Sequence, residues 1–574
     1  MKSQNLALTI SIFFSLIILL SSCGNQDAKD ALNQEEVQKM EAEFSTFIKE
    51  VEGTLDGLYK NSSLAAWNAY NSGKDQDFAI SEEADIALNN YLANKEVFEK
   101  LKEFKESGLI QDTDLNRMLL LSYNAFLGCQ IDTAKLNAVT LLSSDISKRF
   151  QNFRAKVDGK VLTDNDIENI LATSKDSKKL EKTWLAHKEI GNLVAEDLIE
   201  LVKMRNEVAK EIGFKNYHEM SLTLSEQDPE AILKLFDELD NLTRDSFKQL
   251  MDEMNDVIAK QCNIKPEELM PWHYQNRYFQ EAPKIYSVDL DKYYKGKDLV
   301  ELTKNYYASI AMPVDDIIAK SDLFEKQGKS QHAFCFDIDR SGDVRVLCNV
   351  RPEEKWMNTM LHEFGHGVYF KYVDMQMPWS FRTPAHTFTT EAIAMLFGRF
   401  AANPTWIKDL LGVPEAEVEK ISETCSKILR LQQLVFSRWS QVMYRFEKSL
   451  YENPDQDLNK LWWDLVEQYQ MIKRPAGRNS PDWATKMHIA SSPCYYHNYH
   501  LGELLASQLY YTIKDKVLGK PDQKEVSFYN EPKVGEFLIG TFFGPGAKYY
   551  WDDKIEKSTG EKLTPKYYAK QFVE

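Results

Sequence analysis

Apolar residues recur every three or four positions over most of this chain, and this spacing constrains the fold more than any other feature. It predicts amphipathic helices in residues 33–55, 81–107, 178–212 and 229–258. Few glycines or prolines interrupt these stretches, so their apolar faces are expected to pack together. With 43% hydrophobic and 27% charged residues, the composition is that of an ordinary globular protein. The sequence therefore predicts a large, mainly α fold.

Strand character is concentrated in residues 333–338 and 344–350, which are rich in β-branched and aromatic side chains. The turn sequence Asp339-Arg340-Ser341-Gly342 lies between them, so a β-hairpin is expected here. Cys335 and Cys348 flank this turn. They would either bridge it in an oxidising compartment or remain two unpaired core cysteines.

A metal-binding motif, His362-Glu363-Phe364-Gly365-His366, follows the expected hairpin. Two histidines four residues apart on a helix project from the same face, and the glutamate after the first can act as a general base. This is the arrangement that a catalytic zinc ion requires. The motif still needs a third ligand.

Glu391 is the predicted third ligand, at the start of a helix twenty-five residues after His366. Two histidines and a carboxylate leave one zinc position open for water, which is the catalytic pattern. Alternatively, Glu391 is only an acidic residue favoured by the helix dipole. His386 is the rival ligand and is otherwise a loop histidine.

The first 22 residues are predicted to be a lipoprotein signal peptide. Lys2 precedes a nearly unbroken apolar run over residues 6–20, and Leu20-Ser21-Ser22-Cys23 resembles a bacterial lipobox. We expect cleavage before Cys23 and lipidation of its sulfur, with a single transmembrane anchor as the alternative. The protein would then lie in the bacterial cell envelope, and Gly24 favours the outer membrane.

Residues 23–32 are polar and are predicted to form a tether, followed by one catalytic domain over residues 33–574. That region contains a single His-Glu-x-x-His motif and no internal repeat. The formal net charge of −17 argues against nucleic acid as a partner. The expected contact with the membrane is through the lipid anchor.

The zinc motif followed by Glu391 in Glu-Ala-Ile resembles the metal site of the M2 peptidases, the angiotensin-converting enzyme family. Other segments are similar to that family in the same order: Ala66-Trp67-Asn68-Ala69-Tyr70-Asn71, Met204-Arg205-Asn206-Glu207, Gly213-Phe214-Lys215-Asn216-Tyr217 and Lys486-Met487-His488-Ile489-Ala490-Ser491-Ser492. The resemblance implies a helical, gluzincin-type fold with a deep central cleft between two lobes and a small hairpin beside the zinc helix.

The resemblance also implies roles for residues outside the metal site. His332 and Ala333 are similar to a family pair that holds extended substrate along a strand edge, which is strand addition. Lys486 matches the lysine that binds the substrate's C-terminal carboxylate, and His488 matches the histidine that contacts the reacting carbonyl. Gln275 is the candidate for the family's carboxylate-binding glutamine.

Two tyrosines follow that histidine in the family, one for the carboxylate and one for the transition state. A one-residue insertion here puts Tyr496 and Tyr499 at those positions, whereas without it Asn498 takes the second. The insertion preserves a phenol where negative charge must be stabilised, so we favour it. Tyr495 is then interpreted as a packed aromatic residue.

The chain departs from the family pattern at two places. Met395 stands where the family has an aspartate that supports a zinc histidine, so that support must come from elsewhere. His497 and Asn498 stand where the family has a chloride-binding arginine between the tyrosines. The sequence therefore gives no basis for assuming chloride activation and leaves chloride dependence open.

The predicted function is zinc-dependent hydrolysis of short peptides, with one Zn²⁺ per chain and Glu363, His488 and Tyr499 as catalytic residues. Capture of a free carboxylate by Lys486 and Tyr496 would release C-terminal dipeptides. Without that capture, the same centre would act as an oligoendopeptidase or remove single residues. A lipoprotein that binds peptides with little turnover is the alternative from another class.

Overall fold

The computed structural model describes the backbone of residues 4–573 and the side chains of residues 34–573. The predicted signal peptide, the lipidated Cys23 and the tether lie outside the described side chains and stay predictions. Among the described residues, none of the helices combines the length and apolarity needed to cross a bilayer.

The chain forms two compact units, here called unit 1 and unit 2. Unit 1 comprises Met1–Leu58 and Ala87–Gln130, and unit 2 comprises Tyr59–Ile86 and Ile131–Glu574. All predicted site residues with described side chains lie in unit 2.

Helices α1 to α4 supply unit 1, and the last part of α1 and most of α2 belong to unit 2. Their bounds are α1 Gln4–Ser72, α2 Asp75–Leu92, α3 Lys95–Ser107 and α4 Thr113–Leu127. The prediction of one helix over residues 81–107 is wrong, because α2 ends at Leu92 and a separate helix, α3, begins at Lys95. The Asn94 side chain accepts hydrogen bonds from the N–H groups of Glu96 and Val97 and so begins α3 as its N-cap.

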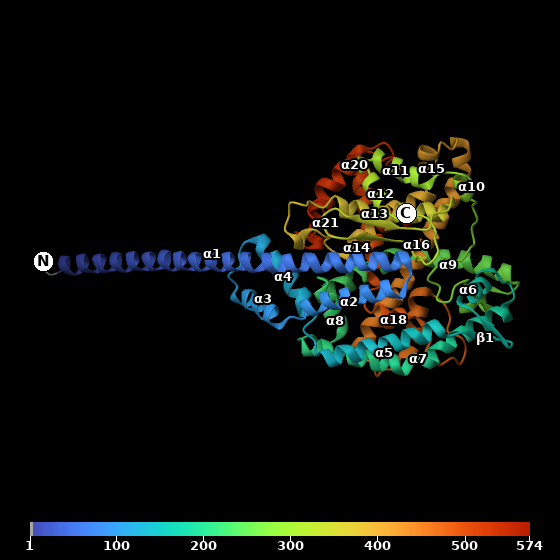
Figure 1. The fold of residues 1–574 in the computed structure, drawn as a ribbon, viewed down its shortest axis with the longest axis horizontal. Coiled ribbons are helices and arrows are strands. Elements are labelled where there is room, and N and C mark those ends of the chain that lie inside the picture. Colours follow the sequence, from blue (N-terminus) through green and yellow to red (C-terminus); the bar gives the residue numbers. More distant parts are fainter. Residues whose placement is uncertain (1–3, 574) are drawn as a thin grey trace. The chain divides into compact units, whose positions relative to one another are not determined.

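The rest of unit 2 is a packed set of helices (Figure 1). In chain order they are α5 Thr133–Asn152, α6 Asp164–Thr173, α7 Ser177–Glu211, α8 Tyr217–Leu224, α9 Pro229–Cys262, α10 Asp291–Tyr294, α11 Leu299–Ser309, α12 Asp315–Lys320, α13 Glu354–Lys371, α14 Thr387–Gly398, α15 Pro404–Leu411, α16 Glu415–Glu452, α17 Leu458–Leu465, α18 His488–Ser491, α19 His497–Tyr511, α20 Pro532–Phe537, α21 Trp551–Thr559 and α22 Lys566–Phe572. Helices α7 and α9 confirm the predictions for residues 178–212 and 229–258.

Two antiparallel hairpins are the only sheets among residues 4–573. The predicted hairpin is confirmed as β3 Phe334–Asp337 and β4 Val344–Leu347. Sequence reasoning missed β1 Ala155–Val157 and β2 Lys160–Leu162, although Asp158-Gly159 between them is a strong hairpin turn signal.

The thiols of Cys335 and Cys348 are both free in this structure. Residue 335 stands opposite Val346 in the β3–β4 register, and residue 348 lies beyond the end of β4. The hairpin is therefore held by its ladder and packing, and the second of the two interpretations of these cysteines applies.

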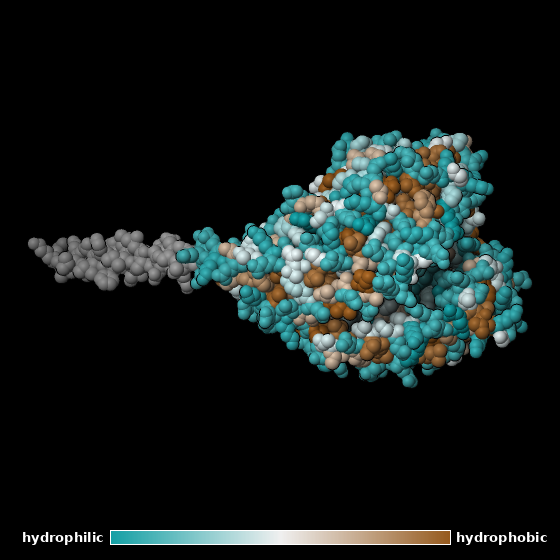
Figure 2. Space-filling model, in the orientation of Figure 1, coloured by the Kyte–Doolittle hydropathy of each residue, from teal (hydrophilic) through white to brown (hydrophobic). Residues whose placement is uncertain are grey.

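The long helix α16 packs against α7, α9, α15 and α19 and so connects two sides of unit 2. In Figure 1, α11, α13 and α15 lie on one side, and α5 and α7 lie on the other. On the face drawn in Figure 2, the surface between these sides is deeply hollowed. The predicted mainly α architecture is confirmed.

Candidate active site

The three predicted metal ligands meet at the crossing of α13 and α14. Nε2 of His362 lies 3.8 Å from Oε2 of Glu391, and Nε2 of His366 lies 3.9 Å from the same oxygen. One donor atom from each residue lies within 4.8 Å of the others, in the only such group of three or more possible ligands among the described side chains. Donors about 2.1 Å from a tetrahedral zinc ion lie about 3.4 Å apart, so this set fits zinc.

Glycines bring the three helices around this cluster unusually close together. A Cβ added at Gly365 of α13 would lie 2.9 Å from the Cα of Ala394, which is backbone of α14. A Cβ added at Gly502 of α19 would lie 3.3 Å from the Cβ of Glu391. Both contacts are tight, so the residue between the two zinc histidines sets how closely the third ligand can approach.

Thr390 supports one of the metal-binding histidines. Its hydroxyl lies 2.8 Å from Nδ1 of His366, which leaves Nε2 directed at the cluster. The sulfur of Met395 lies beside Gly502 instead. The zinc histidine His366 is therefore supported by Thr390, the residue directly before the third ligand. The sequence alone did not identify this support.

His386 is not a ligand in this structure. It is the N-cap of α14, and its Nδ1 accepts a hydrogen bond from the N–H of Phe388 at 3.1 Å. Burial lowers its pKa to about 4, so the ring is neutral and able to accept. The loop histidine thus fixes the start of the helix that carries Glu391.

Burial determines the protonation of the cluster. It lowers the pKa of His362 to about 4 and that of His366 well below the usual value, so both imidazoles are neutral, as metal ligands must be. Burial and the charge of Glu391 raise the pKa of Glu363 to about 8, and burial raises that of Glu391 to about 7. A dication at the cluster would offset both carboxylate shifts.

The hairpin lies against the metal-binding helix α13. Cys335 of β3 faces this helix, with its sulfur 3.8 Å from a Cβ built at Gly367. Phe334 and Phe336 point to the other face, where their rings lie 5.2 Å from Tyr70 and 6.3 Å from Trp67 of α1. Strand β3 pairs only with β4 among the described residues, so its other edge is available for strand addition.

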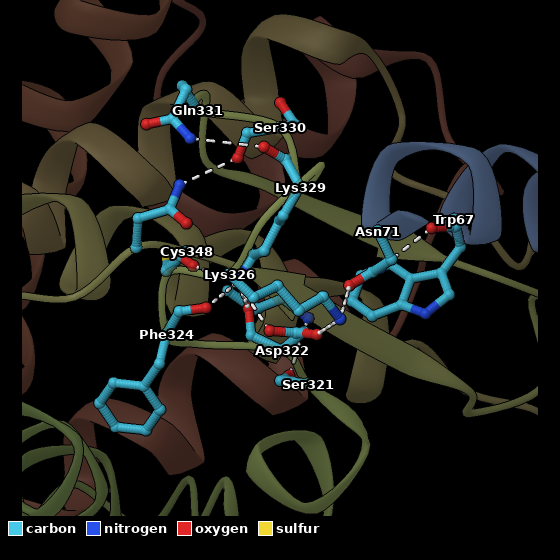
Figure 3. A network of polar contacts seen from close by, with 12 residues as sticks. Trp67, Asn71, Ser321, Asp322, Phe324, Lys326, Lys329, Ser330, Gln331 and Cys348 are labelled. Carbon is cyan, nitrogen blue, oxygen red and sulfur yellow. Dashed lines mark hydrogen bonds and ion pairs between the residues drawn. The ribbon is translucent and has the colours of Figure 1, made fainter. Parts of the chain in front are cut away.

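His332 and Ala333 lie directly before β3, and His332 is exposed. The loop before them is held by Lys329, as Figure 3 shows. The buried Lys329 ammonium donates to the carbonyls of Phe324 at 2.8 Å and Cys348 at 2.5 Å, and to the side-chain carboxylate of Asp322 at 2.7 Å. These bonds join the approach to β3 to the chain that leaves β4.

Lys486 is buried in an aromatic pocket and forms no ion pair with a carboxylate among the described residues, although the charge of the nearby Glu281 acts to raise its pKa. Its Nζ donates to Oε1 of Gln280 at 2.5 Å. The same nitrogen lies 5.0 Å from the ring centre of Tyr278 and 5.3 Å from those of Trp439 and Tyr496. Burial and the charge of Arg277 lower its pKa to about 7. An anion bound here would restore the preference for the ammonium form.

Ring contacts connect this lysine to the metal cluster. The rings of His488 and Tyr496 are 5.3 Å apart, and those of Tyr496 and Tyr499 are 5.5 Å apart. The charge of Glu391 helps to raise the pKa of Tyr499, which places that phenol near the third ligand. The structure thus brings the predicted residues His488, Tyr496 and Tyr499 together between Lys486 and the cluster.

Asn498, the alternative for the second tyrosine position, is directed elsewhere. Its buried side chain accepts a hydrogen bond at 2.7 Å from Gln227, whose own oxygen lies 2.7 Å from Nε2 of His497. Tyr499 is therefore the residue of the two that faces Glu391. The register that assigns roles to Tyr496 and Tyr499 stays a prediction.

The structure does not bring Gln275 to Lys486. Gln275 has a left-handed backbone conformation with φ 59°. Its side-chain amide donates a hydrogen bond to Oε1 of Gln261 and accepts one from the N–H of Lys284. Gln280, five residues later, is the glutamine at the lysine. The sequence did not identify Gln280, because both glutamines lie in one irregular segment. Without regular secondary structure there, their distances from Lys486 could not be predicted.

Comparison with known protein families identifies one match over most of this chain. Residues 38–569, nearly the whole chain, match the family described as Peptidase M2, angiotensin-converting enzyme. The chain belongs to this family. Its fold and its family membership thus agree with the resemblance carried by the sequence motifs.

Relatives of this M2 peptidase are distant. It is 22% identical over 488 residues to an angiotensin-converting enzyme of Haematobia irritans exigua, which covers 76% of this chain and 77% of that one. It is 20% identical over 573 residues to the mouse angiotensin-converting enzyme-like protein Ace3, with 91% and 74% covered. An inactive angiotensin-converting enzyme-related protein of Caenorhabditis elegans is 19% identical over 502 residues, with 79% and 54% covered. Catalysis must therefore be argued from the site itself.

Proposed function

We propose that this M2 peptidase is zinc-dependent and releases dipeptides from the C-termini of short peptides. The observation that carries the proposal is the buried Lys486 ammonium, which forms no ion pair with a carboxylate among the described residues and is connected to a three-ligand cluster through Tyr496 and Tyr499. A buried, unpaired cation beside a hydrolytic centre is matched by a substrate that ends in a carboxylate.

His362, His366 and Glu391 would hold the zinc ion. When bound, zinc acts as a Lewis acid that acidifies water and polarises the peptide carbonyl. The chain leaves room for this chemistry because it supplies three ligands and not four. Thr390 keeps the His366 ring in the orientation that binding requires.

Glu363 is the general base. It follows the first histidine on α13, is only 8% exposed, and packs near the hairpin that would hold the substrate. It would take a proton from the attacking water and return it to the leaving amine. Burial strengthens this transfer because it places the proton acceptor in a site with little competing solvent.

His488 and Tyr499 would stabilise the carbonyl oxygen as negative charge builds on it. Burial and the nearby Lys486 lower the pKa of His488 to about 4, so its ring is neutral and donates one N–H. Burial raises the pKa of Tyr499, so its hydroxyl keeps its proton and also donates. Both donors are preorganised by packing, which is the main requirement for such stabilisation.

The substrate would lie along the free edge of β3. Main-chain groups at Ala333, next to His332, would pair with an extended peptide, as in strand addition. Lys486, Gln280 and Tyr496 would then bind its terminal carboxylate. Because this anchor would fix the terminal carboxylate relative to the metal cluster, the position of cleavage would be measured from the C-terminus. The similarity of these site residues to those of the M2 peptidases supports release of a dipeptide.

Hydrolysis of an N-blocked tripeptide with a free C-terminus tests the peptidase proposal. We expect cleavage that a chelator abolishes and zinc restores, and that is lost in Glu363→Gln while zinc content stays unchanged. Binding of the tripeptide to the zinc-loaded protein without cleavage would overturn the proposal and support the binding-lipoprotein alternative.

We also propose that the protein is exported and anchored through a lipid on Cys23, on the strength of the lipobox sequence. Cys23→Ala should move the protein from the membrane fraction to the soluble fraction and abolish incorporation of labelled palmitate. Retention in the membrane fraction without label would favour a transmembrane anchor instead.

A further inference from the structure

Tyr495 lies at the metal end of the site and is not the packed core residue that its sequence context suggests. Its side chain is partly exposed, and its ring lies 5.3 Å from that of Tyr499 at an interplanar angle of 84°. Tyr499 in turn is three residues before Gly502, the close contact of α19 with Glu391. Tyr495 itself precedes α19, which begins at His497, and it reaches the third ligand's side of the site through its ring contact with Tyr499.

The phenol groups of Tyr495 and Tyr499 are both available to a ligand. Among the described residues, neither hydroxyl makes a hydrogen bond with a protein group. The nearby Tyr278 differs, because its hydroxyl donates to the carbonyl of Thr485 at 2.5 Å. Half-buried phenols usually find a partner, so two free ones side by side at a hydrolytic centre point to substrate.

The backbone holds Tyr495 in place through an unusual conformation. Cys494, directly before it, adopts φ 55°, which a residue with a Cβ rarely adopts. The N–H of Cys494 donates to the buried Glu447 carboxylate at 2.9 Å, and the carbonyl of Tyr495 accepts from the N–H of Asn498 at 3.0 Å. Such a conformation persists only where surrounding contacts impose it.

Arg205 provides a second restraint on the same segment. Its guanidinium, which is buried, donates to the carbonyls of Ile489 at 2.9 Å and Ala490 at 2.5 Å. Two buried charged groups, Arg205 and Glu447, therefore hold the segment that leads into Tyr495. These bonds fix the backbone from which the Tyr495 side chain extends.

A tyrosine phenol has an ordinary pKa near 10, and burial raises the pKa of both Tyr495 and Tyr499 further. Both hydroxyls consequently remain protonated at neutral pH and can act only as neutral donors or acceptors. This is the state required to stabilise a developing oxyanion.

We propose that Tyr495 is a second phenolic donor at the reacting carbonyl and shares with Tyr499 the stabilisation of its negative charge. The inference rests on the proposed function, since it concerns the same centre. It differs from the role of Tyr496, whose ring lies toward Lys486 and His488. Two donors that overlap in function predict that removing one is partly compensated by the other.

Kinetics of Tyr495→Phe, Tyr499→Phe and the double variant test this redundancy. Loss of a single oxyanion donor costs about 10²–10³ in kcat when no other donor replaces it. We expect about a tenfold fall in kcat for each single variant and about a thousandfold fall for the double variant, with KM within about twofold. Tyr286→Phe, a half-exposed phenol bonded to Glu253, is the control and should match the wild type.

Binding of a phosphonic tripeptide analogue, measured by calorimetry on the zinc-loaded protein, provides a readout without turnover. Tyr495→Phe should weaken the analogue about tenfold and leave the product dipeptide unchanged, whereas a merely structural role would weaken both. Unchanged analogue affinity, together with a double variant equal to Tyr499→Phe, would overturn the inference. Failure of the wild type to cleave the tripeptide would instead overturn the proposed function, and analogue binding would still decide the role of Tyr495.

Discussion

The two ends of the site are built in different ways. At the metal end, Gly365 and Gly502 allow three helices to meet so closely that the ligands are set by backbone packing. At the carboxylate end, Lys486 and Gln280 come from irregular segments. Their side chains are hydrogen-bonded to each other, and the aromatic rings around Lys486 pack against its ammonium group. The metal end thus brings charged and ligating groups to one point, whereas the carboxylate end holds a buried cation that forms no ion pair with a carboxylate among the described residues.

We therefore expect that some substitutions will impair substrate binding alone and that others will impair zinc binding and catalysis. Changes at the carboxylate end should raise KM and leave zinc bound, because no ligand moves. Changes at the helix crossing should alter zinc content and stability together, because the ligands and the core share the same contacts.

Lys486→Met should give the largest effect at the carboxylate end. Removing one partner of a buried charge pair costs about 2–5 kcal/mol, so kcat/KM for peptides with a free C-terminus should fall by about 10²–10³. Zinc content should stay at one ion per chain. Lys473→Met, which removes an exposed lysine, is the matched control. An equal loss in both variants would contradict the separation.

Gly365→Ala should give the largest effect at the metal end. The added methyl group meets the α14 backbone, and such overpacking costs about 1–3 kcal/mol of unfolding free energy. Denaturant unfolding and zinc content measure the result. Gly367→Ala is the control, because its nearest neighbour is a flexible Ile317 side-chain atom at 3.3 Å, and it should be less destabilising. Equal stability of the two variants would contradict the role of Gly365 in the close approach of α13 and α14.

Thr390→Val should weaken zinc binding without changing the fold. It removes the hydroxyl beside Nδ1 of His366, and loss of such support typically lowers metal affinity about 10–100-fold. Thr390→Ser keeps the hydroxyl and should bind zinc like the wild type. Zinc titration against a competing chelator distinguishes them, and equal affinities would show that the hydroxyl has no role in binding.

The pH dependence of product binding should be the mildest signature. The pKa of Lys486 is lowered to about 7, so its ammonium form predominates below pH 7 and is lost as pH rises through that value. The inhibition constant of a free-carboxyl dipeptide should therefore rise above about pH 7, by up to about tenfold per pH unit. In Lys486→Met the inhibition constant should not change with pH. An inhibition constant that falls with rising pH in the wild type would contradict the role of Lys486 in binding the carboxylate.

Much of the metal end could be predicted from the sequence because helical geometry converts fixed spacings into positions. His362 and His366 are neighbours on any helix, and Glu391 follows on the next long one. The hairpin was also predictable, since its turn and strand residues are adjacent in the chain. Both depend only on local contacts.

The carboxylate end could not be predicted fully because its contacts join distant segments. Gln280 and Lys486 are 206 residues apart, and nothing local distinguishes Gln280 from Gln275. Tyr495 looked like an ordinary aromatic residue because the left-handed turn at Cys494 that directs it depends on the buried Glu447. Thr390 was missed although it adjoins Glu391, since its role appears only once α13 and α14 cross.

The most direct test of dipeptide release compares one peptide with a free C-terminus and the same peptide amidated, with products measured by mass spectrometry. We predict successive loss of dipeptides from the free peptide and no cleavage of the amidated one, because Lys486 would then have no carboxylate to bind. Equal cleavage of both peptides at internal bonds would contradict the account and identify an oligoendopeptidase.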